Sequence, residues 1–375
     1  MSVGSSVRWS SLSDCRIDGG RPDGWSAAHD TYHRVMVRTC PSARALVVGP
    51  VLGLSVLLAS CSSAPSVVQP STARPRAAEP AVSPPLRTEP AGTVVSAGPA
   101  AQGVAVDPST GMVAVGQEGG ADLFDESGRH LVAVRLPSAP RHIGLQAPGG
   151  PFLVPAEASS ELALVAEPSG TTSALVPTGA MPHDVTVTGG TVFVGNEHDS
   201  TLTVVRGAVP IATVPVATQP GGLAVSGPDV AAVAVRARRL QLFDASTRHL
   251  VADVPLAGGP SHVAAFGDRL YVVDTAGTHV AVFSRLPHLH QIGSVTVPAS
   301  PLGMAVDVAH SRLWITCTAG NRLVELSLVR SVPRLVANLP TVREPDTVAV
   351  DAVSGTVFVV GVRPGTLQIV HPAPA

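Results

Sequence analysis

Histidines recur at one place in a repeated sequence pattern. His142 and His262 each lie two residues after a proline and just before an apolar run, and His183 follows its proline directly. Imidazole nitrogens are common ligands of transition metals, and Glu197 or Asp184 could add an oxygen ligand. Alternatively, histidines at a junction between loop and strand hydrogen-bond a nearby backbone carbonyl, and the sequence favours this interpretation. His142 and His262 are therefore weak candidates for a metal site.

Charged loop residues supply the remaining binding candidates, which are His198, Arg236 and Arg363. His198 stands between two acidic residues, as is typical of a solvated turn. Arg236 belongs to an arginine-rich loop that could bind an anion, although a solvated charged loop is the more common case. The sequence has no Gly-x-Ser-x-Gly elbow, P-loop, HExxH motif or Rossmann glycine pattern. It therefore assigns no catalytic residue and identifies no cofactor.

A different chemistry is indicated at Cys61. Arg38 and Arg44 precede an apolar run over 45–58, and small residues follow it in Leu58-Ala59-Ser60-Cys61. This order is typical of a secretory signal, and the apolar run is too short to span a bilayer. Leu-Ala-Ser-Cys resembles the bacterial lipobox, whose cysteine is diacylated. We expect Cys61 to carry a lipid that anchors the chain at the extracytoplasmic face of the cell membrane. The alternative is an ordinary secretory signal with a chance cysteine.

The chain before the repeats divides into three segments. Residues 1–35 are polar, and we interpret them as an extension upstream of the true start at Met36, or as a real N-terminal extension. Residues 36–60 form the signal peptide. Residues 61–92 contain recurrent prolines among Ser, Ala and Arg, which predicts a flexible tether of polyproline II type. Such a tether could reach about 90 Å at roughly 3.1 Å per residue.

The composition excludes several classes of protein. The formal net charge is -2 and no basic run occurs, so nucleic-acid binding is not expected. Aromatic residues make up 3% of the chain, which argues against a carbohydrate platform or a stacked quinone cofactor. Every basic residue is arginine, a bias of GC-rich genomes that favours, with the lipobox, an actinobacterial-type envelope. Beyond Cys61 only Cys317 remains, so we expect no intramolecular disulfide in the mature chain.

The rest of the chain repeats with a period near forty residues. Six prolines, each before a short apolar run, lie 38 to 44 residues apart; they are Pro140, Pro182, Pro220, Pro260, Pro301 and Pro345. Three more β-rich runs follow in each unit, separated by turn residues. This period and content are typical of β-propeller blades. We predict an all-β, seven-bladed propeller of four-stranded antiparallel blades over residues 93–375.

The seventh unit lacks its fourth run, because the chain reaches Pro372 soon after Leu367–Val370. Near the other end, Thr93–Ala97 resembles the fourth run of the third unit, Ala212–Val216. We therefore expect the N-terminal strand to complete the last blade, which leaves no long edge unpaired.

The repeated segments resemble the YVTN/YncE-type seven-bladed propellers over roughly Thr93 to Val370. The best examples are Leu302–Asp307 with Arg312–Thr316, and Asp346–Asp351 with Thr356–Val360. The tetrapeptide that gives the family its name is only approximated. The resemblance implies the propeller fold. Members of the fold act as binding platforms, while similar propellers serve as lactonases, lyases or quinoprotein dehydrogenases, so the activity does not transfer with the architecture.

We expect a monomeric, membrane-tethered scaffold that binds a protein or a small ligand at the loop-rich mouth of the channel, and not an enzyme. The alternative is a propeller hydrolase or lyase of the lactonase or streptogramin-lyase kind, which could depend on a metal. The two differ in one structural respect. Convergence of His142, His183 and His262 with a carboxylate around a pocket favours the enzyme, whereas splayed histidines and a mouth filled by small residues favour the scaffold.

Overall fold

The computed structural model describes residues 76–372. The predictions for the extension over 1–35, for the signal peptide over 36–60 and for Cys61 fall outside these residues. Within 76–372, no helix has the length and hydropathy that crossing a membrane would require. The described part contains one short 3-10 turn, η1 (Thr318–Gly320), and is otherwise built from strands and loops.

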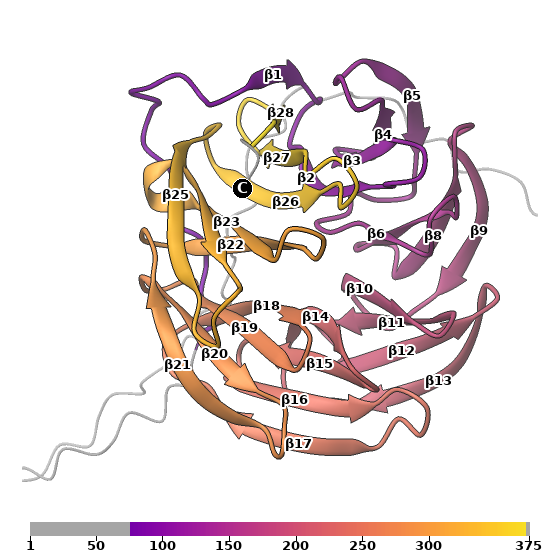
Figure 1. Cartoon of the computed structure of the whole chain (residues 1–375). Helices are drawn as coiled ribbons and strands as arrows, with labels where there is room; N and C mark the ends of the chain where they lie inside the picture. Colours follow the sequence, from indigo (N-terminus) through magenta and orange to yellow (C-terminus); the bar gives the residue numbers. More distant parts are fainter. Residues whose placement is uncertain (1–75, 373–375) are drawn as a thin grey trace, which may run out of the picture. The chain divides into compact units, whose positions relative to one another are not determined.

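Seven four-stranded antiparallel sheets form the ring, as the sequence predicts (Figure 1). Blade 1 contains β2 (Gln102–Val106), β3 (Val113–Gln117), β4 (Gly120–Phe124) and β5 (His130–Arg135). Blade 2 contains β6 (Gly144–Leu145), β7 (Phe152–Ala156), β8 (Glu161–Ala166) and β9 (Thr171–Pro177). Blade 3 contains β10 (Pro182–Thr188), β11 (Thr191–Asn196), β12 (Thr201–Arg206) and β13 (Val209–Pro215).

The remaining blades repeat this order. Blade 4 contains β14 (Pro220–Ser226), β15 (Asp229–Ala234), β16 (Arg239–Asp244) and β17 (Leu250–Pro255). Blade 5 contains β18 (Pro260–Phe266), β19 (Arg269–Asp274), β20 (His279–Ser284) and β21 (His290–Thr296). Blade 6 contains β22 (Pro301–Asp307), β23 (Arg312–Cys317), β24 (Arg322–Ser327) and β25 (Arg334–Pro340). Blade 7 contains β26 (Pro345–Val350), β27 (Val357–Gly361), β28 (Thr366–Val370) and β1 (Thr93–Ser96).

Blade 7 takes its outer strand from far away in the sequence. β1 pairs antiparallel with β28, with Thr93 opposite Ile369 and Ser96 opposite Thr366. Strands from both ends of the described chain thus share one sheet. The side chain of Val95 packs against the same core cluster that contains Ile369. An unpaired β28 would present a row of free backbone groups to solvent.

The apolar core consists of seven clusters, one between each pair of neighbouring blades. The inner strands β2, β6, β10, β14, β18, β22 and β26 contact one another in sequence, and β26 contacts β2. The blade middles alternate Val, Ala and Leu with a few large side chains, such as the fully buried Trp314 and Tyr271. Because this packing fixes the inner strands around a common axis, it also fixes where their first residues point.

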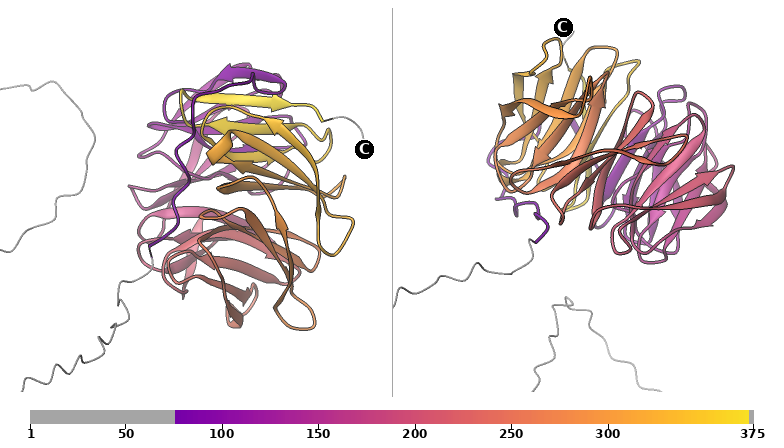
Figure 2. Two further views of the ribbon diagram at one scale, coloured as in Figure 1. Left: turned by 90° about the vertical axis from the view of Figure 1, so that its left-hand side faces the viewer. Right: turned by 90° about the horizontal axis from the view of Figure 1, so that it is seen from below.

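Residues 76–92, which we call the N-terminal strap, lie on the propeller. Figure 2 shows the strap as the indigo segment along one face of the ring. The Ser83 hydroxyl, 2% exposed, donates to the Thr318 carbonyl oxygen at 2.6 Å and accepts from the Glu344 N–H at 3.1 Å. The Asn321 amide donates to the Pro84 carbonyl oxygen at 2.9 Å. Such contacts were not expected for a flexible tether over 61–92. They form because an extended proline-rich chain still presents hydroxyl and carbonyl groups that can hydrogen-bond to loops.

Candidate functional site

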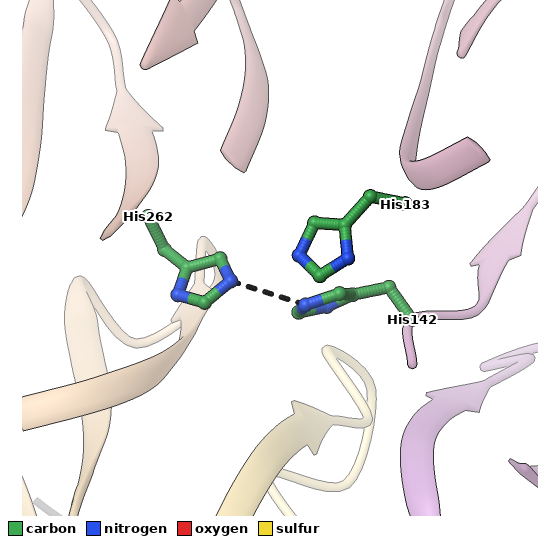
Figure 3. Close-up of side chains that lie close together, drawn as sticks. All are labelled: His142, His183 and His262. Carbon is green, nitrogen blue, oxygen red and sulfur yellow. Dashed lines mark hydrogen bonds between the residues drawn. The ribbon is translucent and has the colours of Figure 1, made fainter. Parts of the chain in front are cut away.

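Three histidines from three blades meet in the channel (Figure 3). His142 precedes β6, His183 is the second residue of β10, and His262 is the third residue of β18. The Nε2 atoms of His142 and His262 are 3.1 Å apart and share a hydrogen bond. One ligand atom from each of the three rings lies within 4.8 Å of the others. The rings therefore surround one small space.

Local irregularities of the inner strands aim these side chains inward. β10 has a bulge between Pro182 and Asp184, so His183 has no partner on β11. β18 has a corresponding irregularity between Pro260 and Val263, which contains His262. Bulges redirect side chains and are frequent next to functional sites. They explain why His183, one residue out of step in the sequence repeat, still reaches the other two histidines.

Carboxylates and one guanidinium hold the third histidine. His183 Nδ1 lies 3.0 Å from Glu157 Oε1, which leaves Nε2 directed away from that carboxylate. Arg141 donates to Glu157 at 2.7 Å and to Glu197 at 2.9 Å. His262 is oriented separately, since its Nδ1 lies 3.1 Å from the Ser261 hydroxyl oxygen. At least two of the three rings are thus held by neighbouring polar groups.

The three imidazoles are neutral at physiological pH. Burial lowers the pKa of His142 and His183 well below the ordinary value, and the charge of Arg141 lowers it further. Burial and the charge of Arg141 lower the pKa of His262 to about 4. Neutral imidazoles keep a free electron pair on one nitrogen, which is the form that ligates a metal.

The histidines border two cavities. The first, here called the mouth pocket, has a volume of about 150 Å³ and is lined by His142, His183, His262, Arg141, Glu197 and Asp346, among others. The second, of about 160 Å³, lies against His142, His262 and Asp184. Burial raises the pKa of Asp346 to about 7, and the charge of Glu157 adds to this effect against the opposing charge of Arg141. Burial likewise raises the pKa of Asp184 to about 7, although the N–H groups of Leu223 and Val185 donate to it.

The N-terminal strap forms part of the mouth pocket, because Ala77, Ala78, Glu79 and Pro80 line it. The Ala81 N–H donates to the Ser300 hydroxyl at 2.9 Å and holds the strap at the rim. Sequence analysis missed this role, since proline-rich composition predicts no fixed position. The strap's connection to β1, which is fixed in blade 7, is the only signal that could have indicated it.

The structure brings together some of the sequence-predicted candidates and separates others. His142, His183, Glu197 and His262 line the mouth pocket, and Asp184 lines the cavity beside it. His198, Arg236 and Arg363 are exposed and line neither cavity; Arg363 instead faces Glu344 at 3.5 Å. Arg141, Glu157 and Asp346 also belong to the site and are not among the sequence-predicted candidates. Their importance depends on distances across blades, which no local motif records.

Comparison with solved structures shows the same fold in proteins of different function. The chain superposes on hydrazine synthase of Kuenenia stuttgartiensis with a TM-score of 0.65 and 13% identity, over 73% of this chain and 96% of that one. It superposes on streptogramin B lyase with a TM-score of 0.63 and 12% identity, over 75% and 96%. For the WD40 propeller domain of Doa1 the values are 0.64, 9%, 75% and 96%.

The comparisons show the fold and no more, because identities this low do not carry an activity. No protein-family profile and no curated protein matches the chain. The resemblance to YVTN/YncE-type propellers therefore stays a prediction. The function has to be inferred from the mouth pocket itself.

Proposed function

We propose that the chain is a membrane-tethered, extracytoplasmic propeller that binds a small ligand in the mouth pocket. The observation that carries this proposal is the pocket itself: it gathers three neutral imidazoles, an arginine and several carboxyl groups in a protein with 14% charged residues. Titratable groups with shifted pKa values that converge in a cavity are a mark of functional sites. A cavity of about 150 Å³ can hold a small molecule or an ion but is too small for the surface of a protein partner.

The tether half of the proposal rests on Leu58-Ala59-Ser60-Cys61. Because the strap occupies residues 76–92, only 62–75 would separate the lipid from the propeller. That segment could extend about 43 Å at roughly 3.1 Å per residue, half the reach expected for a tether over 61–92. The mouth pocket would then work close to the membrane surface.

Fractionation of cells expressing the wild type and Cys61→Ser tests the tether. We expect the wild type in the membrane fraction and labelled by a palmitate analogue, and the variant released and unlabelled, because serine lacks the thiol that accepts the acyl chain. A wild type that is soluble and unlabelled would refute the lipid anchor.

Thermal shift against a library of small anionic and neutral metabolites tests the ligand half. Ligands of the mouth pocket should raise the Tm of the wild type but not the Tm of the double variant His142→Ala/His262→Ala. The exposed control His249→Ala should show the same rise in Tm as the wild type. If no small molecule raises the Tm of the wild type, and the double variant captures an envelope protein as well as the wild type does, the chain is a protein scaffold that uses another surface.

A metal-dependent hydrolase or lyase is the second candidate function. The convergence of His142, His183 and His262 with carboxyl groups around one pocket is the arrangement that the sequence analysis associated with an enzyme. Asp346, with a pKa of about 7, could take up or release a proton near neutral pH. Turnover of lactones or esters that requires added metal and falls at least 100-fold in Asp346→Asn would support this function; equal turnover in the variant would exclude Asp346 as the base.

A further inference from the structure

The three histidines already have the separation of a set of metal ligands. In a tetrahedral zinc site with Zn–N bonds of about 2.0–2.1 Å, ligand nitrogens lie about 3.3 Å apart. The Nε2 atoms of His142 and His262 are 3.1 Å apart, close to this value. Since all three ligand atoms lie within 4.8 Å of one another, the third needs to close by at most about 1.5 Å.

A carboxylate orients the third histidine, His183. Metal-ligating histidines usually donate their other N–H to a carboxylate, which sets the tautomer and orients the ring. His183 has this partner, because Glu157 Oε1 lies 3.0 Å from Nδ1. Glu157 is itself held by Arg141 at 2.7 Å. In this tautomer, the free electron pair of His183 is on Nε2, the atom that the other two histidines also direct into the shared space.

The charges around the pocket favour a cation. Among the residues that line the mouth pocket, Arg141 supplies the one guanidinium group, and it is paired with Glu157 and Glu197. Glu79 and Asp346 add two further carboxyl groups to the lining. Carboxyl groups thus outnumber guanidinium groups, and the imidazoles are uncharged. An anionic ligand alone would meet an excess of like charge, whereas a divalent cation would relieve it.

A set of three imidazoles selects among the cations. Calcium and magnesium prefer oxygen ligands, whereas imidazole suits zinc, copper, iron and nickel. Three protein ligands with a fourth position open to a cavity is the arrangement of catalytic zinc sites, and structural zinc sites are closed by four protein ligands. The space next to the histidines is the mouth pocket, which is where an incoming ligand would reach the ion.

We propose that His142, His183 and His262 bind one divalent transition-metal ion, zinc in the first place, through their Nε2 atoms, and leave one coordination position open to the mouth pocket. Glu157 acts as a positioning residue that orients His183. The proposal deepens the proposed function, since it names the ion through which the mouth pocket would bind its small ligand.

Zinc titration of the full chain, purified in detergent and stripped with a chelator, tests the site. We expect one zinc per chain by calorimetry and elemental analysis. His142→Ala, His183→Ala and His262→Ala should each weaken binding at least 100-fold, while the exposed His249→Ala control leaves it unchanged. Glu157→Gln should weaken zinc binding about 10- to 100-fold, the usual loss for such a partner. Melting curves without metal show whether each variant is folded.

Cobalt provides a second readout that does not depend on affinity alone. Co²⁺ in a four-coordinate site should give intense visible absorption in the wild type, which is lost in His183→Gln even where that variant retains its fold. A wild type that binds no more zinc than His142→Ala/His262→Ala, or that shows no cobalt spectrum, overturns the metal site. If small molecules still raise the Tm of the metal-free wild type in that case, the proposed function survives without the metal.

Discussion

Two groups of acidic side chains behave differently in this propeller. Asp107, Asp307 and Asp351 occupy equivalent turns of blades 1, 6 and 7, and each accepts a hydrogen bond from a backbone N–H two or three residues later. They close the turn between the first two strands of a blade. Asp184 and Asp346, by contrast, have no acidic counterpart at the equivalent position of another blade, and burial raises the pKa of each to about 7.

In a repeat protein, recurrence separates polar residues that support the fold from those that serve a site. A polar residue that returns in several blades solves a problem that every blade shares, such as satisfying a tight turn. A polar residue that appears once, is buried and stays poorly compensated costs stability without helping the repeat. Such costs persist where the group has another use, which here is the mouth pocket.

The largest expected effect concerns the strand that completes blade 7. Deletion of 93–97 unpairs β28 and opens the core shared by Val95 and Ile369, so we expect aggregation or a Tm lower by on the order of 10 °C. Deletion of 62–75 is the control and should leave Tm unchanged. Equal melting temperatures for the two deletions would mean that β1 contributes nothing to closure.

Replacement of one residue from each acidic group sharpens the comparison directly. The Asp307 carboxylate, which is 1% exposed, hydrogen-bonds the backbone N–H and the ring Nδ1 of His310. Asp307→Ala removes both bonds and should lower the free energy of unfolding in urea by about 1–3 kcal/mol. Asp346→Asn should leave the stability of the metal-free protein unchanged or higher, because it removes a buried carboxyl group. The comparison fails if Asp346→Asn destabilises the fold as much as Asp307→Ala does.

The strap provides a smaller effect. Ser83→Ala removes the hydrogen bonds that the Ser83 hydroxyl makes with the Thr318 carbonyl oxygen and the Glu344 N–H, so we expect a loss of about 1 kcal/mol in the free energy of unfolding. Thr88→Ala, an exposed position of the same strap, is the matched control and should be neutral. Identical unfolding curves for the two variants would show that the strap is not held at the rim.

The smallest effect is a pH dependence away from the mouth. Partial burial, together with the hydrogen bond and charge of Asp107, raises the pKa of Glu167 to about 7. The folded state therefore holds a proton that the unfolded state has lost, and stability should fall as pH rises from about 4.5 to about 7. Asp184 and Asp346 contribute in the same direction, so Glu167→Gln should reduce this slope in urea melts at pH 5 and pH 8, whereas the exposed Glu126→Gln should leave it unchanged. An unchanged slope in Glu167→Gln would assign the pH dependence to other groups.

Much of the fold could be predicted from the sequence, since period, strand pattern and turn chemistry are local. The predicted runs Ala212–Val216 and Thr93–Ala97 correspond to β13 and β1, and the blade count follows from the spacing of the prolines. The site was only partly predictable. The equivalent positions of His142 and His262 indicated a common direction, but the bulge at His183 and the pairing of Arg141 with Glu157 depend on how neighbouring blades pack.

The strap was the least predictable part. Its prolines and small residues carry no period, so the sequence indicated only an extended chain. Its position depends on single hydrogen bonds between Ser83 or Ala81 and loops more than 200 residues away. Contacts of this kind have no signature in the strap itself.

A crystal structure of the zinc-loaded full chain, with anomalous data on both sides of the zinc edge, tests the three-histidine site most directly. We predict one strong anomalous peak in the mouth, about 2.0–2.1 Å from Nε2 of His142, His183 and His262. Zinc found only at surface histidines, such as the exposed His288 and the neighbouring ring of His290, or no peak in the channel, would contradict the metal site.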